Sequence, residues 1–230
     1  MNNFYLYIFI LCFIILSVST FTHYYKYYVL KEGFSQNTNN KRTIILLGDS
    51  IIKNNSYVKN GKGIDEILKE KTNGNSYCYA ENNSTIVDVY SQVSSIPIEL
   101  NKESTIIFLS SGGNDILEKY VERDINVENT DILNVIFIAY KKLIKSIQTK
   151  MNKSKLVLID IYYPVNIKYQ QYKPILEEWN KLLNDFVGES DDLSIIKVSN
   201  ELTDSTDFTL NIEPSDTGGE KIADLILFYY

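Results

Sequence analysis

Residues 43–51 read TIILLGDSI, a run of β-branched and aliphatic side chains that ends in Gly-Asp-Ser-Ile. A short apolar run bounded by such a turn signal is typical of a strand buried on both faces. Four further runs have a similar composition: SYCYAE at 76–81, STIIFLSS at 104–111, KLVLIDIYY at 155–163 and LSIIKVS at 193–199. We therefore expect a sheet whose strands are covered on both sides.

Segments with a helical pattern of apolar residues alternate with these runs. They are IDEILKEK (64–71), TIVDVYSQV (85–93), a long segment from Asp131 to about Met151, one from about Lys173 to Val187, and a last one from Ser215. Strands that alternate with helices predict a parallel sheet, because parallel strands need a crossover connection. The predicted fold class is α/β, a three-layer α/β/α sandwich with a mainly parallel, doubly wound sheet and with sites at the carboxyl ends of its strands.

The segment before this domain is apolar. Residues 4–21 (FYLYIFILCFIILSVSTF) contain no charged side chain, and the run is just long enough to cross a bilayer as a helix. We expect a transmembrane anchor or signal segment at 1–30, a polar linker at 31–42 and the domain at 43–230. An uncleaved apolar helix is favoured over a cleaved signal peptide, because the chain begins Met-Asn-Asn without basic residues.

Two sequence features point to opposite sides of the membrane. Lys26 and Lys31 favour a cytoplasmic domain by the positive-inside rule. Sequons for glycosylation favour a lumenal or extracellular domain, and they begin at Asn54, Asn82, Asn83 and Asn152. The expected location is a single-pass membrane protein or a secreted protein, with the side of the membrane left open.

The composition excludes several classes of protein. The net charge is −6 and the lysines are scattered among acids, so we expect no nucleic-acid partner. Cys12 lies in the apolar segment and Cys78 in a predicted strand, which excludes a disulfide framework. With one histidine and no paired cysteines, we expect no metal and no cofactor.

Two predicted strands end in residues that suit a functional site. Ser50 closes the first run, and Gly112-Gly113-Asn114-Asp115 follow the run at 104–111. The pair of glycines, Gly113 included, lets the backbone approach a ligand closely, and Asn114 offers a side-chain N–H to a developing oxyanion. Each motif is also a common turn, so the two carry weight only together.

The Gly-Asp-Ser and Gly-Gly-Asn-Asp blocks, in this order and context, resemble those of the SGNH/GDSL hydrolase superfamily, and the resemblance covers the whole predicted domain. It implies that Ser50 is the nucleophile and that its own N–H and the Asn114 side chain help form an oxyanion hole. It makes Asp49 and Asp115 supporting residues. Asn83 stands where the superfamily has an oxyanion-hole glycine, and Asn is the residue next most able to adopt glycine-like backbone angles.

The last block departs from the superfamily pattern. Asp-x-x-His-Pro is usual before the final helix, whereas residues 210–219 read LNIEPSDTGG. Glu213 therefore stands at the position of the histidine, and Leu210 at that of the aspartate. The only histidine, His23, adjoins the apolar segment and is a poor candidate to reach Ser50. The Ile-Glu-Pro-Ser pattern resembles a subgroup of SGNH-like proteins that has the same first and third blocks.

Two roles are open to Glu213. Its carboxylate can accept the serine proton, and burial would raise its pKa towards neutral pH. In that role Asp207 would share a proton with it or orient it. Alternatively, Glu213 serves only the loop before the final helix, where Ser215 is the N-cap.

The expected function is that of a serine esterase-like hydrolase, with Ser50 as nucleophile and Glu213 as base. Its substrate would be an acyl ester, such as an acylated glycan or a lipid. The alternative is a catalytically impaired, membrane-tethered protein that uses the same fold to bind a ligand, motivated by the missing histidine. A third hypothesis, an interaction protein, rests on the 18 tyrosines.

Overall fold

The computed structural model describes residues 42–59, 62–120 and 130–230. Residues Arg42–Tyr230 form one compact unit. The predicted apolar helix at 4–21 and the linker that follows it lie outside the described residues. Within the described part of the chain, no helix is long and apolar enough to cross a membrane.

The main sheet has five parallel strands in the order β2-β1-β3-β4-β5. This is the order found in flavodoxin-like folds, and it confirms the predicted parallel, doubly wound sheet. β1 and β3 are interior strands that pair along their whole length and end side by side, with Gly48 opposite Ser110. The strands are β1 (Thr43–Gly48), β2 (Ser76–Cys78), β3 (Thr105–Ser110), β4 (Lys155–Ile159) and β5 (Leu193–Ile196).

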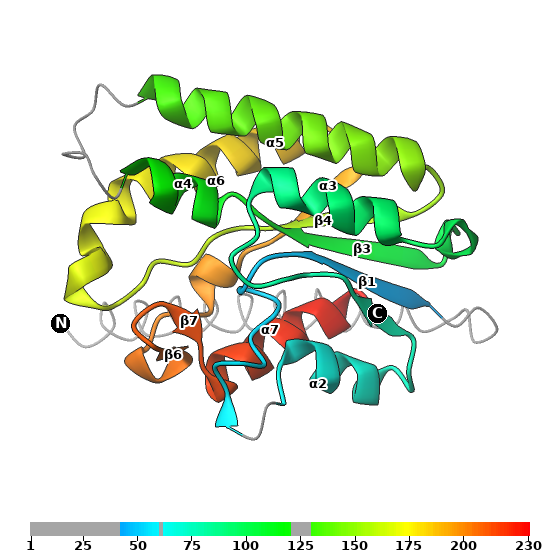
Figure 1. Ribbon diagram of the computed structural model, residues 1–230, viewed down its shortest axis with the longest axis horizontal. Helices are drawn as coiled ribbons and strands as arrows, with labels where there is room; N and C mark the ends of the chain where they lie inside the picture. Colours follow the sequence, from blue (N-terminus) through cyan, green and yellow to red (C-terminus); the bar gives the residue numbers. More distant parts are fainter. Residues whose placement is uncertain (1–41, 60–61, 121–129) are drawn as a thin grey trace, which may run out of the picture. The chain divides into compact units, whose positions relative to one another are not determined.

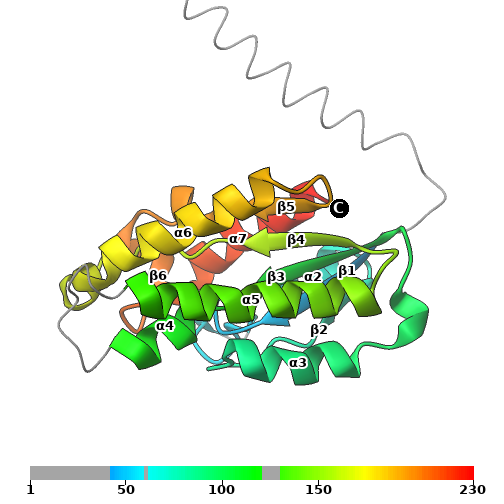
Figure 2. The same ribbon diagram turned by 90° about the horizontal axis from the view of Figure 1, so that it is seen from above.

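Helices cover both faces of this sheet (Figures 1 and 2). Figure 1 shows α3, α5 and α6 on one face and α2 and α7 on the other, which is the predicted three-layer arrangement. α4 follows β3 and packs against α5. The helices are α2 (Ile64–Lys71), α3 (Ile86–Ser95), α4 (Gly113–Tyr120), α5 (Thr130–Lys150), α6 (Lys173–Gly188) and α7 (Asp216–Phe228).

The core lies between the sheet and these helices. Every residue of β3 and all but the first of β1 are buried, which explains why both strands read as continuous apolar runs. On the α5–α6 side, Phe137 and Tyr140 meet Trp179 edge to face, with ring centroids 5.5 and 5.3 Å apart. Burying one large apolar side chain contributes roughly 1.5–3 kcal/mol, so these layers hold the carboxyl ends of the strands firmly in place.

Three local features differ from the expectations of the sequence. The Gly-Gly-Asn-Asp block opens α4 instead of a polar loop, because Ile116 and Tyr120 bury the inner face of a short helix there. The run at 155–163 leaves the sheet after Ile159, and Ile161 and Tyr162 line the cleft described below. A small antiparallel hairpin precedes α7, formed by β6 (Phe208–Thr209) and β7 (Glu213–Pro214).

Short 3-10 helices complete the described fold. They occur in connections that the sequence marks only as loops or strand ends. They are η2 (Ile98–Leu100), η4 (Ile167–Tyr172), η5 (Val198–Asn200) and η6 (Ser205–Asp207).

Candidate active site

The turn that presents Ser50 is fixed by close contact with the neighbouring strand. Gly48 has φ 130°, and a Cβ atom there would lie 1.7 Å from the carbonyl oxygen of Ser110, so only glycine fits. The Gln92 side chain accepts from the Gly48 N–H at 2.8 Å and donates to the Gly48 carbonyl at 2.9 Å. Ser50 thus leaves β1 in one defined direction, at the carboxyl edge of the sheet.

Asp49 supports this turn from inside the protein. Its side chain is 2% exposed, and its Oδ1 accepts hydrogen bonds from the Ser110 hydroxyl at 2.9 Å and the Ile51 N–H at 3.1 Å. Burial raises the pKa of Asp49 to about 7, although these two hydrogen bonds lower it. The negative charge of Glu213 raises it further. Asp49 is therefore protonated over most of the acidic range.

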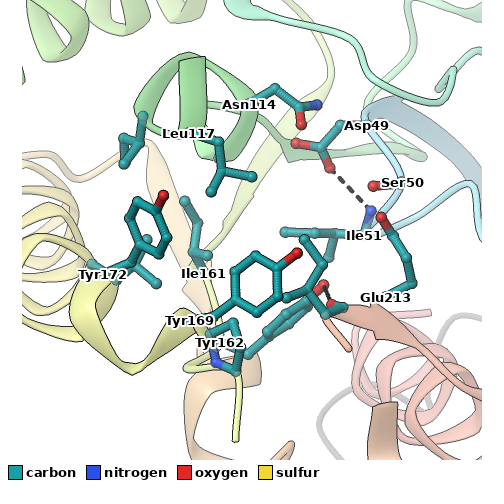
Figure 3. Close-up of a pocket in the computed structure, with 15 residues that line it drawn as sticks. Asp49, Ser50, Ile51, Asn114, Leu117, Ile161, Tyr162, Tyr169, Tyr172 and Glu213 are labelled. Atoms are coloured by element: carbon teal, nitrogen blue, oxygen red, sulfur yellow. Dashed lines mark hydrogen bonds between the residues drawn. The ribbon is translucent and has the colours of Figure 1, made fainter. Parts of the chain in front are cut away.

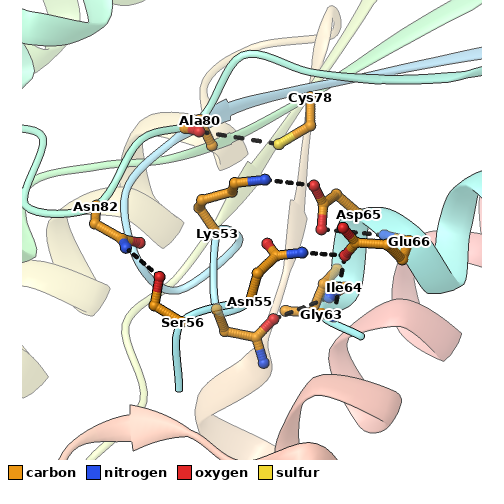
Figure 4. A network of polar contacts seen from close by, with 11 residues as sticks. Lys53, Asn55, Ser56, Gly63, Ile64, Asp65, Glu66, Cys78, Ala80 and Asn82 are labelled. Carbon is orange, nitrogen blue, oxygen red and sulfur yellow. Dashed lines mark hydrogen bonds and ion pairs between the residues drawn. The ribbon is translucent and has the colours of Figure 1, made fainter. Parts of the chain in front are cut away.

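The loop that follows Ser50 is fastened to α2 (Figure 4). Lys53 forms an ion pair with Asp65 at 2.6 Å, and the Asn55 side chain donates to Glu66. Glu66 also accepts from the N–H of Gly63, just before α2 begins. Both ends of this loop are therefore held, one by β1 and one by α2.

Glu213 lies beside Ser50 on the wall of a cleft (Figure 3). Burial raises the pKa of Glu213, and the adjacent Ser50 side chain lowers it by less. Its Oε2 atom is buried and has no hydrogen-bond partner among the described residues. A buried carboxylate oxygen without a donor, next to a serine, is placed to accept a proton.

Contacts on both sides of Glu213 hold it in place. The Tyr162 hydroxyl donates to the carbonyl of Ile212 at 2.5 Å. On the other side, the Asn54 side chain donates to the carbonyl of Pro214 at 3.2 Å. Asn54 is fully buried, and its Oδ1 accepts from the N–H of Ile64. A direct hydrogen bond thus joins the loop after Ser50 to the hairpin that carries Glu213.

Two glycines make this approach possible. A Cβ atom at Gly218 would lie 2.2 Å from the carbonyl oxygen of Asp207, and one at Gly219 would lie 2.8 Å from Nδ2 of Asn54. The N-terminus of α7 therefore packs directly against Asp207, just before the hairpin, and against the loop that follows Ser50. Ser215 is the N-cap of α7, as the sequence predicts, and accepts from the Gly218 N–H at 3.2 Å.

The expected oxyanion-hole residues lie on two linked segments. Asn83 is exposed and has φ 60°, in the left-handed region that glycine adopts readily. Asn114 lines the cleft and donates from Nδ2 to the carbonyl of Ser84 at 2.9 Å, which leaves its second amide hydrogen for a ligand. Asp115 accepts from the N–H of Ile86 at 3.0 Å and so caps α3. Gly113 lines the cleft, but a Cβ there would make only ordinary contacts.

The cleft is apolar away from these polar groups. Asp49, Ser50, Asn114 and Glu213 are its polar side chains apart from tyrosine hydroxyls. The rest of the lining consists of Ile51, Gly113, Ile116, Leu117, Ile161, Tyr162, Pro164, Tyr169, Tyr172, Leu176 and Ile212.

Comparison with known proteins identifies the fold. No family model matches the chain, and no curated protein matches it either. Solved structures do match. A lipolytic protein of the G-D-S-L family from Veillonella parvula is 19% identical with a TM-score of 0.61, covering 81% of this chain and 96% of its own. A family 3 carbohydrate esterase from Clostridium thermocellum is 18% identical with a TM-score of 0.59, covering 82% and 94%.

A lipase from a goat rumen metagenome is 14% identical with a TM-score of 0.62, covering 81% of this chain and 96% of its own. The chain has the SGNH/GDSL hydrolase fold. Ser50 and Asn114 both line the cleft at the carboxyl edge of this sheet. Among the described residues, no three His, Cys, Asp or Glu side chains gather as metal ligands would.

The expected contact between Asp207 and Glu213 is corrected. Asp207 does not orient Glu213, because its buried carboxylate is bound to Lys221 at 2.8 Å and to the N–H groups of Thr203 and Asp204. Burial raises the pKa of Asp207, but Lys221 and these N–H groups outweigh it and hold the pKa below its ordinary value. Asp207 instead fixes the start of the hairpin that carries Glu213.

Sequence reasoning missed several residues around this cleft. The backbone beside Ser50 and Glu213 is held by three side chains, those of Asn54, Gln92 and Tyr162, and each is one polar residue in an ordinary segment. A buried Asn or Gln has no local signature, since only its tertiary partners mark it.

Proposed function

We propose that this chain is a serine ester hydrolase in which Ser50 is the nucleophile and Glu213 replaces histidine as the base. The observation that carries the proposal is the pairing of Ser50 with a half-buried carboxylate whose Oε2 has no partner. The similar structures named above include a lipase and a carbohydrate esterase, which supports ester hydrolysis as the reaction class.

In the proposed mechanism the Ser50 hydroxyl attacks the acyl carbonyl while its proton passes to the Glu213 carboxylate. The negative charge that develops on the carbonyl oxygen is met by the backbone N–H groups of Ser50 and Asn83 and by the free amide hydrogen of Asn114. The tetrahedral intermediate collapses to an acyl-serine, and Glu213 returns the proton to the departing alcohol. A water molecule, deprotonated by Glu213, then attacks the acyl-serine, and Glu213 returns the proton to the Ser50 oxygen as the carboxylic acid leaves.

The apolar lining supports an ester whose acyl chain is held by side chains such as Leu117, Ile161 and Leu176. An acylated glycan and a lipid share this acyl chemistry. The competing proposal is a catalytically impaired protein that binds a ligand. It predicts that the cleft binds the ester but does not hydrolyse it.

We also propose that residues 4–21 tether the domain to a membrane, because the run is uncharged over the length of a spanning helix. N-terminal sequencing of the purified protein from its native membrane tests this. An intact start indicates an anchor, whereas a chain that starts after about Ser19 indicates a cleaved signal and a secreted protein.

The reaction is tested on the full chain in detergent with a short-chain aryl ester between pH 4 and 9. We expect turnover that disappears in Ser50→Ala, and a fluorophosphonate probe that labels the parent at Ser50. Glu213→His serves as the matched replacement, since it restores the usual residue of the fold. A parent that neither turns over nor takes the probe, beside an active Glu213→His variant, would establish the ligand-binding alternative.

A further inference from the structure

Three exposed apolar side chains stand around the mouth of the cleft. Ile167 is 84% exposed, Leu210 65% and Val165 37%. Val165 precedes η4, Ile167 is the first residue of η4, and Leu210 comes from the turn between β6 and β7. We call these three residues the rim. The two segments are joined at their tips, because the Asn166 side chain donates to that of Asn211 at 2.7 Å.

The rim continues the apolar wall of the cleft to the surface. Pro164 and Tyr169 flank the rim residues of the η4 segment, and both line the cleft. Ile212 lies two residues beyond Leu210 and also lines it. Figure 1 shows both segments at the end of the sheet where β1 and β3 finish. An acyl chain could therefore pass from the rim to Ser50 along apolar side chains.

Leu210 adds an independent indication. Its φ of 47° lies in the left-handed region, where a leucine is strained, and its side chain gains little burial in return. A strained residue that holds an apolar side chain in water points to a role outside the folded core. Isolated exposed apolar residues are ordinary, but this one belongs to a cluster at a cleft.

The charges around the rim suit a lipid surface. Residues 161–173 and 208–212 contain no acidic side chain, although the chain as a whole has a net charge of −6. Lys168, which is exposed, directly follows Ile167, and Lys173 ends the same stretch. Apolar side chains beside lysines match the acyl and phosphate layers of a bilayer surface that contains anionic lipid.

We propose that the rim docks on a phospholipid bilayer and receives from it an acyl ester embedded there. The docking surface stands on its own, whereas the delivery of a substrate rests on the proposed ester hydrolase function. The apolar run at 4–21 supports this occupant.

Docking is tested without any need for activity. The full chain carrying Ser50→Ala and Ile167→Trp is reconstituted into phosphatidylcholine vesicles that contain phosphatidylglycerol and brominated lipid. The one native tryptophan, Trp179, is fully buried, so it gives a constant background. Ile98→Trp is the matched control, because Ile98 is 64% exposed and lies before β3, at the opposite edge of the sheet.

We expect the tryptophan introduced at position 167 to shift to the blue and to be quenched by brominated lipid, and the one introduced at position 98 to show neither effect. No quenching at position 167 would overturn the proposal and favour a protein partner for the rim. Equal quenching at both positions would also overturn it, since the rim would then have no special contact.

Delivery of the substrate is tested with Ile167→Asn combined with Leu210→Asn. Because each side chain loses its apolar transfer energy, we expect hydrolysis of a vesicle-embedded long-chain ester to slow by about tenfold or more. Hydrolysis of a water-soluble short-chain ester should stay unchanged, as it should for both esters in Ile98→Asn. Equal losses on both esters would count against delivery. Inactivity of the parent on both esters would refute the hydrolase function, and the quenching result would still decide the docking.

Discussion

Ser50 and Glu213, the proposed nucleophile and the proposed base, are held in place in different ways. Ser50 follows β1, an interior strand that is buried on both faces, and the Gln92 side chain holds its turn through two hydrogen bonds with Gly48. Glu213 lies in a two-residue strand outside the main sheet, where polar contacts from Tyr162 and Asn54 position it. The Ser50 turn is therefore fixed by the core, whereas the proposed base lies in a hairpin outside the main sheet.

Removing the base without changing its shape should have the largest effect. In Glu213→Gln we expect kcat/KM for a short-chain ester to fall by about 10²- to 10⁴-fold, because the amide cannot accept the Ser50 proton. In the parent, kcat/KM should rise with pH through the raised pKa of Glu213, since only its carboxylate form is the base. Steady-state kinetics from pH 4 to 9 measures both.

Asp207→Asn, at the end of η6 directly before the hairpin, is the matched control. It should weaken the contact with Lys221 and lower stability, but leave the position of the acid limb unchanged. If Glu213→Gln keeps parental activity, or if Asp207→Asn moves the acid limb, the two carboxylates have been assigned wrongly.

Asp49 offers a stability test of the turn. Its folded pKa of about 7 lies above its ordinary value of 3.8, so between these values the folded state holds a proton that the unfolded state releases. The free energy of unfolding should therefore fall as pH rises from about 4 to 7, by up to roughly 4 kcal/mol. Denaturant unfolding at several pH values measures the slope. Asp49→Asn should flatten it, and an unchanged slope in that variant would place the titration elsewhere.

The bond between the two regions is the next target. Asn54→Ala leaves the buried Pro214 carbonyl and Ile64 N–H without partners, so we expect a loss of roughly 2–3 kcal/mol of stability. Since Glu213 also loses its support, kcat should fall more than KM changes. Asn166→Ala, which removes an exposed contact, should cost less than about 0.5 kcal/mol. Similar costs for the two variants would show that the buried bridge is unimportant.

The smallest effect should come from the hairpin turn itself. Asn tolerates the left-handed region better than Leu, so Leu210→Asn should stabilise the protein by about 0.5–1 kcal/mol. Thermal unfolding of the purified variant measures this. A loss of stability would mean that the Leu210 side chain packs within the folded protein after all.

Local patterns determined much of the fold. The apolar runs at 43–51 and 104–111 became interior strands, and the helical segments between the runs became the covering layers. These patterns succeed because a strand buried on both faces, or a helix with one buried face, leaves its mark within a few residues. α4 escaped prediction because a helix that opens in Gly-Gly-Asn-Asp has the local signature of a turn.

The sequence by itself determined the parallel α/β sheet, the place of Ser50 at its carboxyl edge and the absence of a histidine from the last block. Only the tertiary structure decided that Glu213 meets Ser50, that Asp207 turns away to Lys221 and that Asp49 is a buried acid with a raised pKa. The physical reason is that the patterns of strands and helices depend on residues that are close together in the sequence. Burial and the partners of a carboxylate, in contrast, depend on chain segments far away in the sequence, and these set its pKa and its chemistry.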